Sequence, residues 1–536
     1  MKRIFTFLTA LILSANMANA QGYEIEVKIK SVPNDTLILG HHFNERLIPD
    51  DTIKLDGTGR GVFRGKEALP TGMYFIFLPN KNYFDFLIDK KAGEKFYIEN
   101  DTANFLESVV IKNSLENQVF MDYQKFLAEK QKQFKELKDQ YDKIKDGKNA
   151  EAKRQEIIDR QNVLNQEVDN KYMEQIKTYP DMFFSKFLTA TRDITIPDNI
   201  TDQTQRYYYY KNHFFDNFDI SDGALLRTPI YQNKIERYID QMVMQMPDSL
   251  IKETTWLVNK TRPKGKLDEK NGELFRFMLV YFFNKYAKSE NMVAENVYCS
   301  LADIYIKDAF WDTDSFKTKL KERVAKKKNC LVGNISKDIT VKLIPDSKEG
   351  MDALRPAIDE LKTKGVEIEK AKPDFEARRN DVVKLLDDFI NKFGKNYYSM
   401  HQMSAKYKLI VFWEPDCSHC KEELPKLCQF FKDTLSATGC EVFAIYMNKS
   451  VDNLADVSRH VGKCFDFLQE KGIYNIKGWH NMFNPFDQYR TNYDINSTPT
   501  IYLLNKDNEI LAKRIAHTQA YDLIKYIEEE QKKQQK

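Results

Sequence analysis

Residues 413–420 read WEPDCSHC and place two cysteines, separated by two residues, where a predicted strand gives way to a predicted helix. The apolar run 408–413 predicts a buried strand, and residues 422–435 have the pattern of an amphipathic helix. Two thiols at this spacing can close a small disulfide ring with little backbone movement, and the dipole of the helix stabilises the thiolate of the first. The stretch therefore predicts thiol-disulfide exchange, with Cys417 and Cys420 as the redox pair.

An alternation of strands and helices surrounds the cysteine pair and predicts an α/β domain over residues 331–536. A strand-like segment at 339–344 leads into a charged, helix-rich insertion at about 345–395. Beyond the pair, the pattern predicts strands at 441–446, 500–504 and 510–514, and helices at 454–471 and 521–531.

Three features in this order resemble the thioredoxin superfamily. The first is the strand-to-helix junction that carries the cysteines, and the second is Pro425, five residues after Cys420, where thioredoxins have a proline that kinks the active-site helix. The third is the segment 497–503, STPTIYL, which is similar to the cis-proline loop of the family. Within the superfamily, the domain resembles the TlpA/ResA-like branch of exported thiol-disulfide oxidoreductases, with the 345–395 segment as an insertion.

The resemblance implies roles for individual residues. Cys417 is expected to attack as the nucleophile and Cys420 to resolve the mixed disulfide, so no cofactor is needed beyond the redox-active disulfide between them. In such folds a proline, here Pro499, lies against the disulfide, and the backbone of the preceding residue, here Thr498, pairs with the substrate peptide. The residues expected to support the pair are Trp413, Ser418, His419 and Pro425.

Other residues near the pair leave its redox potential open. His419 is similar to the histidine of DsbA-type and disulfide-isomerase-type pairs, where the imidazole stabilises the thiolate and makes the protein more oxidising. Val411 stands where thioredoxin keeps a buried acid that assists proton transfer, so the base must come from elsewhere or be water. Asp416 either opposes thiolate formation or, as we expect, caps the helix. Glu414 is a further carboxylate whose place relative to the sulfurs is open.

The chain has seven cysteines, an odd number that argues against complete pairing in a disulfide scaffold. We expect Cys428, Cys440 and Cys464 to be buried small residues rather than a second redox relay. No metal is expected. A zinc site made by the cysteine pair and His419 is disfavoured, because adjacent histidine and cysteine have poor geometry and no second ligand pair accompanies them.

The N-terminus predicts export. Lys2 and Arg3 precede the apolar run 4–13, and Ala18-Asn19-Ala20 forms a small-x-small cleavage signal, so residues 1–20 read as a signal peptide. Gln21 rather than cysteine follows, which argues against N-terminal lipidation. The apolar run is too short for a transmembrane anchor. We expect an exported, periplasmic protein without a transmembrane anchor.

The regions before the α/β domain complete a multidomain prediction. Short β-type runs separated by turn residues predict an antiparallel β-sandwich or barrel at 21–112, and helical periodicity predicts a hairpin at 113–180 and an all-α domain at 181–330. They resemble domains of unknown function that precede such modules. The formal net charge is +3 with both signs interspersed, which shows no footprint for nucleic acid.

The leading hypothesis is a periplasmic thiol-disulfide oxidoreductase that exchanges disulfides with protein clients carrying thiols or disulfides. A membrane electron donor or acceptor is a candidate partner. The direction of electron flow stays open, because the Ser-His dipeptide favours an oxidant and the resemblance favours a reductant. The alternatives are an envelope binding or scaffold protein with an auxiliary thioredoxin-like module, and a thiol peroxidase, against which the paired cysteines argue.

Overall fold

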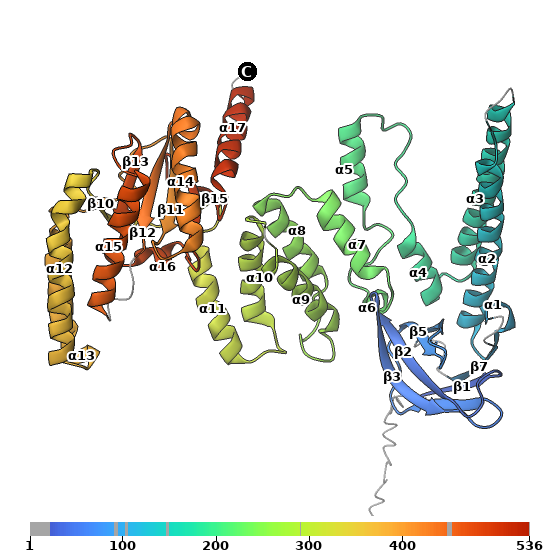
Figure 1. Cartoon of the computed structure of the whole chain (residues 1–536). Helices are drawn as coiled ribbons and strands as arrows, with labels where there is room; N and C mark the ends of the chain where they lie inside the picture. Colours follow the sequence, from blue (N-terminus) through green and yellow to red (C-terminus); the bar gives the residue numbers. More distant parts are fainter. Residues whose placement is uncertain are drawn as a thin grey trace, which may run out of the picture. The chain divides into compact units, whose positions relative to one another are not determined.

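The computed structural model describes residues 22–89, 95–101, 105–145, 149–289, 291–447 and 453–534. The predicted signal peptide at 1–20 lies outside the described residues. Contacts divide the chain into two compact units. The first unit is Met1–Met244 with Asn259–Lys264, and the second is Gln245–Val258 with Gly265–Lys536. From its N-terminal end, the chain has a β-rich region, a helical middle and an α/β region (Figure 1).

The β-rich region of the first unit forms two four-stranded sheets, ordered β4-β1-β7-β8 and β3-β2-β5-β6. Their strands are β1 (Tyr23–Ile29), β2 (Thr36–Phe43), β3 (Arg46–Lys54), β4 (Arg60–Gly65), β5 (Gly72–Phe77), β6 (Tyr83–Ile88), β7 (Lys95–Asn100) and β8 (Val110–Lys112). The prediction of a wholly antiparallel region is wrong, because β1 and β7 pair in parallel. The long connection between them, which includes the second sheet, allows the parallel pairing that a hairpin excludes.

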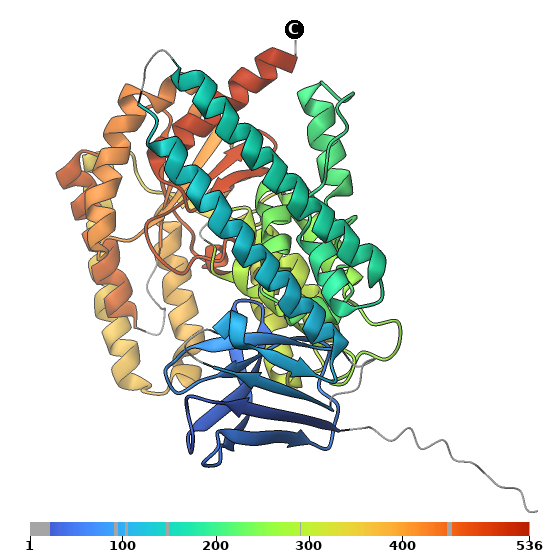
Figure 2. The same cartoon turned by 90° about the vertical axis from the view of Figure 1, so that its right-hand side faces the viewer.

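The remainder of the first unit is helical. Its longest helices, α2 (Leu115–Asp142) and α3 (Ala150–Thr178), form the predicted hairpin and lie side by side (Figure 2). The Lys130 ammonium bonds the Glu167 carboxylate across the hairpin at 2.5 Å. The shorter elements are α1 (Phe105–Ser108), α4 (Phe183–Thr191), α5 (Gln203–His213), α6 (Gly223–Leu226), α7 (Tyr231–Arg237) and a π-helical turn at Tyr238–Met242.

The helices of the second unit include α9 (Glu273–Ala287), α10 (Ala294–Asp308) and α11 (Asp314–Lys328). The helix α8 (Pro247–Lys260) crosses the division between the units. The all-α domain expected at 181–330 is therefore shared between two units rather than forming one. Polar contacts described below join α10 and α11 to the α/β region, and they supply a physical reason for this division.

The α/β region contains a seven-stranded sheet ordered β10-β9-β13-β12-β11-β14-β15. Its strands are β9 (Thr340–Leu343), β10 (Tyr398–Ser399), β11 (Tyr407–Trp413), β12 (Cys440–Tyr446), β13 (Trp479–Phe483), β14 (Thr500–Asn505) and β15 (Ile510–Lys513). Its helices are α12 (Lys348–Ala371), α13 (Phe375–Asn391), α14 (Ser418–Asp433), a 3-10 turn (Leu435–Thr438), α15 (Leu454–Lys471), α16 (Gln488–Asn492) and α17 (His517–Gln534). The predicted insertion corresponds to α12 and α13, whereas the sequence did not predict β13.

The strand β11 occupies the interior of this sheet and is buried along its whole length. Leu409, Val411 and Trp413 join the core that also contains residues of α12, α14 and α15. Ile410 and Phe412, which point to the other face, join a second core with residues of β9 and α16. Side chains alternate across a strand, so a continuous apolar run buries both faces of the sheet. This double burial fixes the strand whose end leads to the cysteines.

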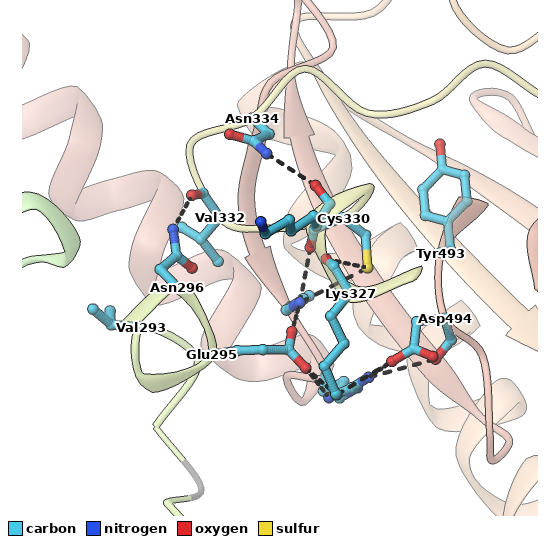
Figure 3. A network of polar contacts seen from close by, with 12 residues as sticks. Val293, Glu295, Asn296, Lys327, Cys330, Val332, Asn334, Tyr493 and Asp494 are labelled. Atoms are coloured by element: carbon cyan, nitrogen blue, oxygen red, sulfur yellow. Dashed lines mark hydrogen bonds and ion pairs between the residues drawn. The ribbon is translucent and has the colours of Figure 1, made fainter. Parts of the chain in front are cut away.

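A network of ion pairs joins α10 and α11 to β15 and to the segment before β14 (Figure 3). The Lys513 side chain is 1% exposed and pairs with the Glu295 carboxylate. It also donates to the Cys330 carbonyl oxygen at 2.8 Å. Lys327 contacts Glu295 and lies 3.4 Å from the Asp494 carboxylate, which also pairs with Arg514 at 3.1 Å.

This network makes a prediction for stability. Burial lowers the pKa of Lys513 to about 7, and Glu295→Gln removes the carboxylate that pairs with the Lys513 ammonium. Breaking a buried pair from one side typically costs 3–5 kcal/mol, so we expect the variant to lose about 3 kcal/mol of unfolding free energy at about pH 5, where the Lys513 side chain is charged. The unfolded lysine is common to both proteins, so the deficit changes only where the folded wild type keeps the Lys513 proton and the folded variant has lost it. The deficit should therefore shrink as pH rises toward about 7 and stay constant above that value.

Denaturation followed by tryptophan fluorescence measures this effect, because all four tryptophans belong to the second unit. The matched control is Asp303→Asn, on the same helix α10, which removes an exposed ion pair with Lys328. That change should cost under about 1 kcal/mol. Equal losses for the two variants would contradict a structural role for the buried network.

Candidate functional site

The two cysteines lie at the start of α14. Cys417 is the N-cap residue of this helix, and its Sγ accepts a hydrogen bond from the Cys420 backbone N–H at 3.3 Å. Cys417 is half-buried and Cys420 is fully buried. The first sulfur therefore stands at the positive end of the helix dipole, within reach of solvent.

The two thiols differ in acidity. Burial acts to raise the pKa of Cys417, but hydrogen bonds from the Cys420 side chain and backbone and from the His419 backbone outweigh it, so the pKa lies below its ordinary value. Burial raises the pKa of Cys420 to about 12. Near neutral pH, the outer sulfur therefore has the greater thiolate character and the inner one keeps its proton.

The segment before β14 lies against the outer cysteine, as the resemblance implies. The Cys417 thiol donates to the Thr498 carbonyl oxygen at 3.2 Å, and the peptide bond between Thr498 and Pro499 is cis. The Thr498 hydroxyl donates to the Glu414 carboxylate at 3.1 Å. The fold thus brings Cys417 together with Thr498 and Pro499, although Cys417 and Thr498 are 81 residues apart in sequence.

The remaining predicted site residues differ in how far their side chains are exposed to solvent. Trp413 is 1% exposed and packs its ring against Phe467, with ring centroids 5.4 Å apart. Pro425 lies inside α14. Ser418 and His419 are exposed on the first turn of the helix. The buried Trp413 and the half-buried Pro425 help to position the helix, while the exposed Ser418 and His419 flank the outer cysteine on the solvent side.

The interpretation of Asp416 as a helix cap is wrong, because Cys417 occupies the N-cap position. Asp416 instead accepts a hydrogen bond from the Lys463 ammonium at 2.6 Å. Lys463 belongs to α15, so this pairing depends on tertiary structure and leaves no signal around residue 416. Val411 is buried in the core, as its apolar side chain requires.

Sequence reasoning also missed a histidine behind the pair. His460, on α15, has a side chain only 2% exposed, and its Nδ1 lies 2.7 Å from the Tyr446 hydroxyl. Its Nε2 lies 3.5 Å from an Asp416 oxygen and 4.0 Å from a Glu414 oxygen. The available signal was a histidine on the apolar face of a predicted helix, close to Val461.

The other cysteines have the environment of core residues. Cys428 is buried, and burial raises its pKa. Burial raises the pKa of Cys440 to about 12 and that of Cys464 well above its ordinary value. Within the described ranges, no cluster of three or more histidine, cysteine or acidic side chains could hold a metal ion. In the same residues, no helix has the length and apolar character needed to cross a membrane.

Comparisons with known proteins give partial matches. A family described as a domain of unknown function, DUF5106, matches residues 149–329, which end before the α/β region. No curated protein matches the chain. A solved thioredoxin-like protein from Bacteroides caccae is similar at 16% identity, with 62% of this chain and 98% of that chain covered and a TM-score of 0.38.

Two further solved structures are similar to smaller parts of the chain. A domain of a possible thiol-disulfide isomerase from Cytophaga hutchinsonii has 28% identity, covers 26% of this chain and 86% of its own, and has a TM-score of 0.22. The thioredoxin domain of a thiol-disulfide oxidoreductase from Bacteroides vulgatus has 19% identity, coverages of 25% and 86%, and a TM-score of 0.20.

The environments of the thiols predict selective alkylation. Treating the reduced chain with iodoacetamide at pH 7 should modify Cys417 at least about tenfold faster than Cys428, because each unit of pKa changes the thiolate population tenfold. Peptide mass spectrometry over time measures both rates in one sample. In Cys417→Ser the fast phase should vanish. Comparable labelling of the two residues in the folded chain would contradict the assignment.

Proposed function

We propose that the chain is a protein thiol-disulfide oxidoreductase that works through Cys417 and Cys420. The observation that carries this proposal is the difference between the two sulfurs. Cys417 is half-buried at a helix N-terminus with a lowered pKa, whereas Cys420 is buried with a pKa raised to about 12. Such a pair has one thiolate that can attack a disulfide and one protonated thiol that can later resolve the mixed disulfide.

As a reductant, the pair works in two steps. The Cys417 thiolate attacks a client disulfide, a mixed disulfide forms between Cys417 and the client, and the other client sulfur leaves as a thiolate. Cys420 then loses its proton and attacks the Cys417 sulfur, which releases the second client sulfur and closes the Cys417–Cys420 disulfide. The client gains the two electrons that the pair loses. The reverse sequence oxidises a client dithiol.

The surroundings of Cys417 suit a protein client. The Thr498 backbone lies against the outer sulfur, in the place from which the family resemblance implies pairing with an extended substrate strand. Ser418 and His419 add an exposed polar border. We propose that clients present a disulfide or a dithiol to this edge, with Trp413 and Pro425 holding the helix in place.

We place the reaction in the periplasm, on the strength of the signal peptide predicted at residues 1–20. A reductant in an oxidising compartment needs a continuing supply of electrons, and a membrane donor is the partner that would provide them. An oxidant would instead pass electrons to an acceptor. The first unit does not contain Cys417 or Cys420, and we propose that it recognises clients or envelope components.

The reaction predicts that removing the resolving thiol traps clients. Cys420→Ser should accumulate mixed disulfides on Cys417, because the second step then lacks its nucleophile. Non-reducing electrophoresis and mass spectrometry of material purified from the cell envelope would identify them. Cys428→Ser, a change farther along the same helix, is the matched control and should trap nothing above the wild type.

A redox titration in glutathione buffer completes this test. The wild type should show one two-electron transition that both single variants of the pair lose. A midpoint near about −120 mV would indicate an oxidant, and one below about −250 mV a reductant. A chain without a redox-active disulfide, whose Cys420→Ser variant trapped no client, would exclude the exchange mechanism and favour the scaffold hypothesis.

A further inference from the structure

A group of ionisable side chains lies directly behind the cysteine pair, and the exchange reaction as written does not use it. Glu414 and Asp416 precede α14, Tyr446 ends β12, and His460 and Lys463 belong to α15. The loop before α14, the end of β12 and α15 therefore bring two carboxylates, an imidazole, a phenol and an ammonium together beyond the C-terminal ends of the interior strands β11 and β12.

His460 is the centre of this group. Its side chain is only 2% exposed, so its ring nitrogens are shielded from bulk water. Nδ1 shares a hydrogen bond of 2.7 Å with the Tyr446 hydroxyl, and burial raises the pKa of Tyr446 well above its ordinary value, so the phenol stays neutral. Nε2 faces the two carboxylates instead. A buried histidine aimed at carboxylates is arranged to share a proton with them.

Glu414 joins this group to the cysteines. A backbone hydrogen bond from Glu414 reaches the Cys420 thiol. One carboxylate oxygen of Glu414 accepts the Thr498 hydroxyl at 3.1 Å, and the other lies 4.0 Å from the His460 Nε2. The main chain of Glu414 thus contacts the buried Cys420 thiol, and its carboxylate lies near His460.

The second step of the exchange has a chemical need that this arrangement meets. Cys420 must lose its proton before it can attack, yet burial holds its pKa at about 12, so only a very small fraction of the thiol ionises unaided at neutral pH. The strand position where thioredoxin has a buried acid is occupied here by Val411. A base placed elsewhere beside the pair would supply the missing function.

We propose that Glu414 is the catalytic base for Cys420, and that His460 is a positioning residue that holds the Glu414 carboxylate and shares its proton. This inference rests on the proposed function. In the resolving step, the Cys420 proton passes to Glu414, the Cys420 thiolate forms a bond to the Cys417 sulfur, and the bond between Cys417 and the client breaks. The client sulfur leaves with the electron pair and takes a proton from solvent.

The charges around His460 are consistent with this role. Among the residues that the structure describes, the titratable and charged groups placed against it include Glu414 and Asp416 from the loop before α14, Tyr446 from β12 and, through Asp416, Lys463 from its own helix. The Lys463 ammonium neutralises Asp416 at 2.6 Å. The Glu414 carboxylate also accepts the Thr498 hydroxyl beside the pair at 3.1 Å, so it is the carboxylate that we assign as the base.

The test separates the two chemical steps. The reduced protein is mixed with excess glutathione disulfide, and acid-quenched samples are analysed by mass spectrometry for glutathione on Cys417 and for the Cys417–Cys420 disulfide. Glu414→Gln keeps an oxygen that accepts the Thr498 hydroxyl but removes the base. We expect it to slow closure of the disulfide about 100-fold at pH 7, while attack by Cys417 stays within about threefold of the wild type.

The pH profile distinguishes a base from a structural residue. In Glu414→Gln, closure should accelerate about tenfold per pH unit, because the thiol then ionises to solvent, whereas the wild type should depend less on pH. His460→Phe replaces the imidazole with an aromatic ring that has no nitrogen. This variant should also close the Cys417–Cys420 disulfide more slowly than the wild type at pH 7. The double variant should be no slower than Glu414→Gln alone, since both residues act on one proton.

The matched control is Glu441→Gln. Glu441 lies on β12 of the same sheet, and its carboxylate bonds His480 at 2.8 Å. It thus forms a carboxylate–histidine pair that involves neither Cys417 nor Cys420. Its closure rate should equal that of the wild type. Normal closure in Glu414→Gln, or equal slowing of both steps, would overturn the inference. Absence of a Cys417–Cys420 disulfide in the wild type would instead overturn the proposed function itself.

Discussion

The site depends on the hydrogen bond from the Cys420 backbone N–H to the Cys417 sulfur. Because Cys417 caps α14, its sulfur occupies the position where a helix usually has an oxygen acceptor, and it receives the stabilisation given to a cap. The same turn of helix buries Cys420. One local geometry therefore sets the opposite acidities of the two thiols, and the buried strand β11 fixes the place of that turn.

Local sequence patterns predict those parts of the site that are recognised from residues adjacent in sequence. The cysteine spacing, Pro425 and the Thr498-Pro499 dipeptide each have a recognisable neighbourhood, and the fold brings the cysteines and the dipeptide together. Helix 454–471 is confirmed as α15, since its apolar face has strong helical periodicity. The strand β13 escaped prediction, because its residues WHNMF include polar side chains that are satisfied only by the neighbouring structure.

The residues that sequence reasoning misplaced depend on contacts between distant segments. Asp416 has the residue type of a helix cap, and only the position of α15 shows that it pairs with Lys463. His460 follows the pair by about forty residues, and its partners come from other elements. The parallel pairing of β1 with β7 is likewise non-local. Such pairings follow from the topology, which no short window of sequence contains.

The pairing of Asp416 with Lys463 also resolves a conflict in the electrostatics of the pair. A carboxylate beside the nucleophile would raise the pKa of Cys417 by repelling its thiolate, yet that pKa is lowered. The Lys463 ammonium at 2.6 Å offsets the charge of Asp416, so the hydrogen bonds at the helix N-terminus prevail. A stabilised thiolate favours the reduced form of a pair and makes it more oxidising. In the proposed exchange reaction, α14 and a lysine from α15 would therefore both act on the redox potential of the pair.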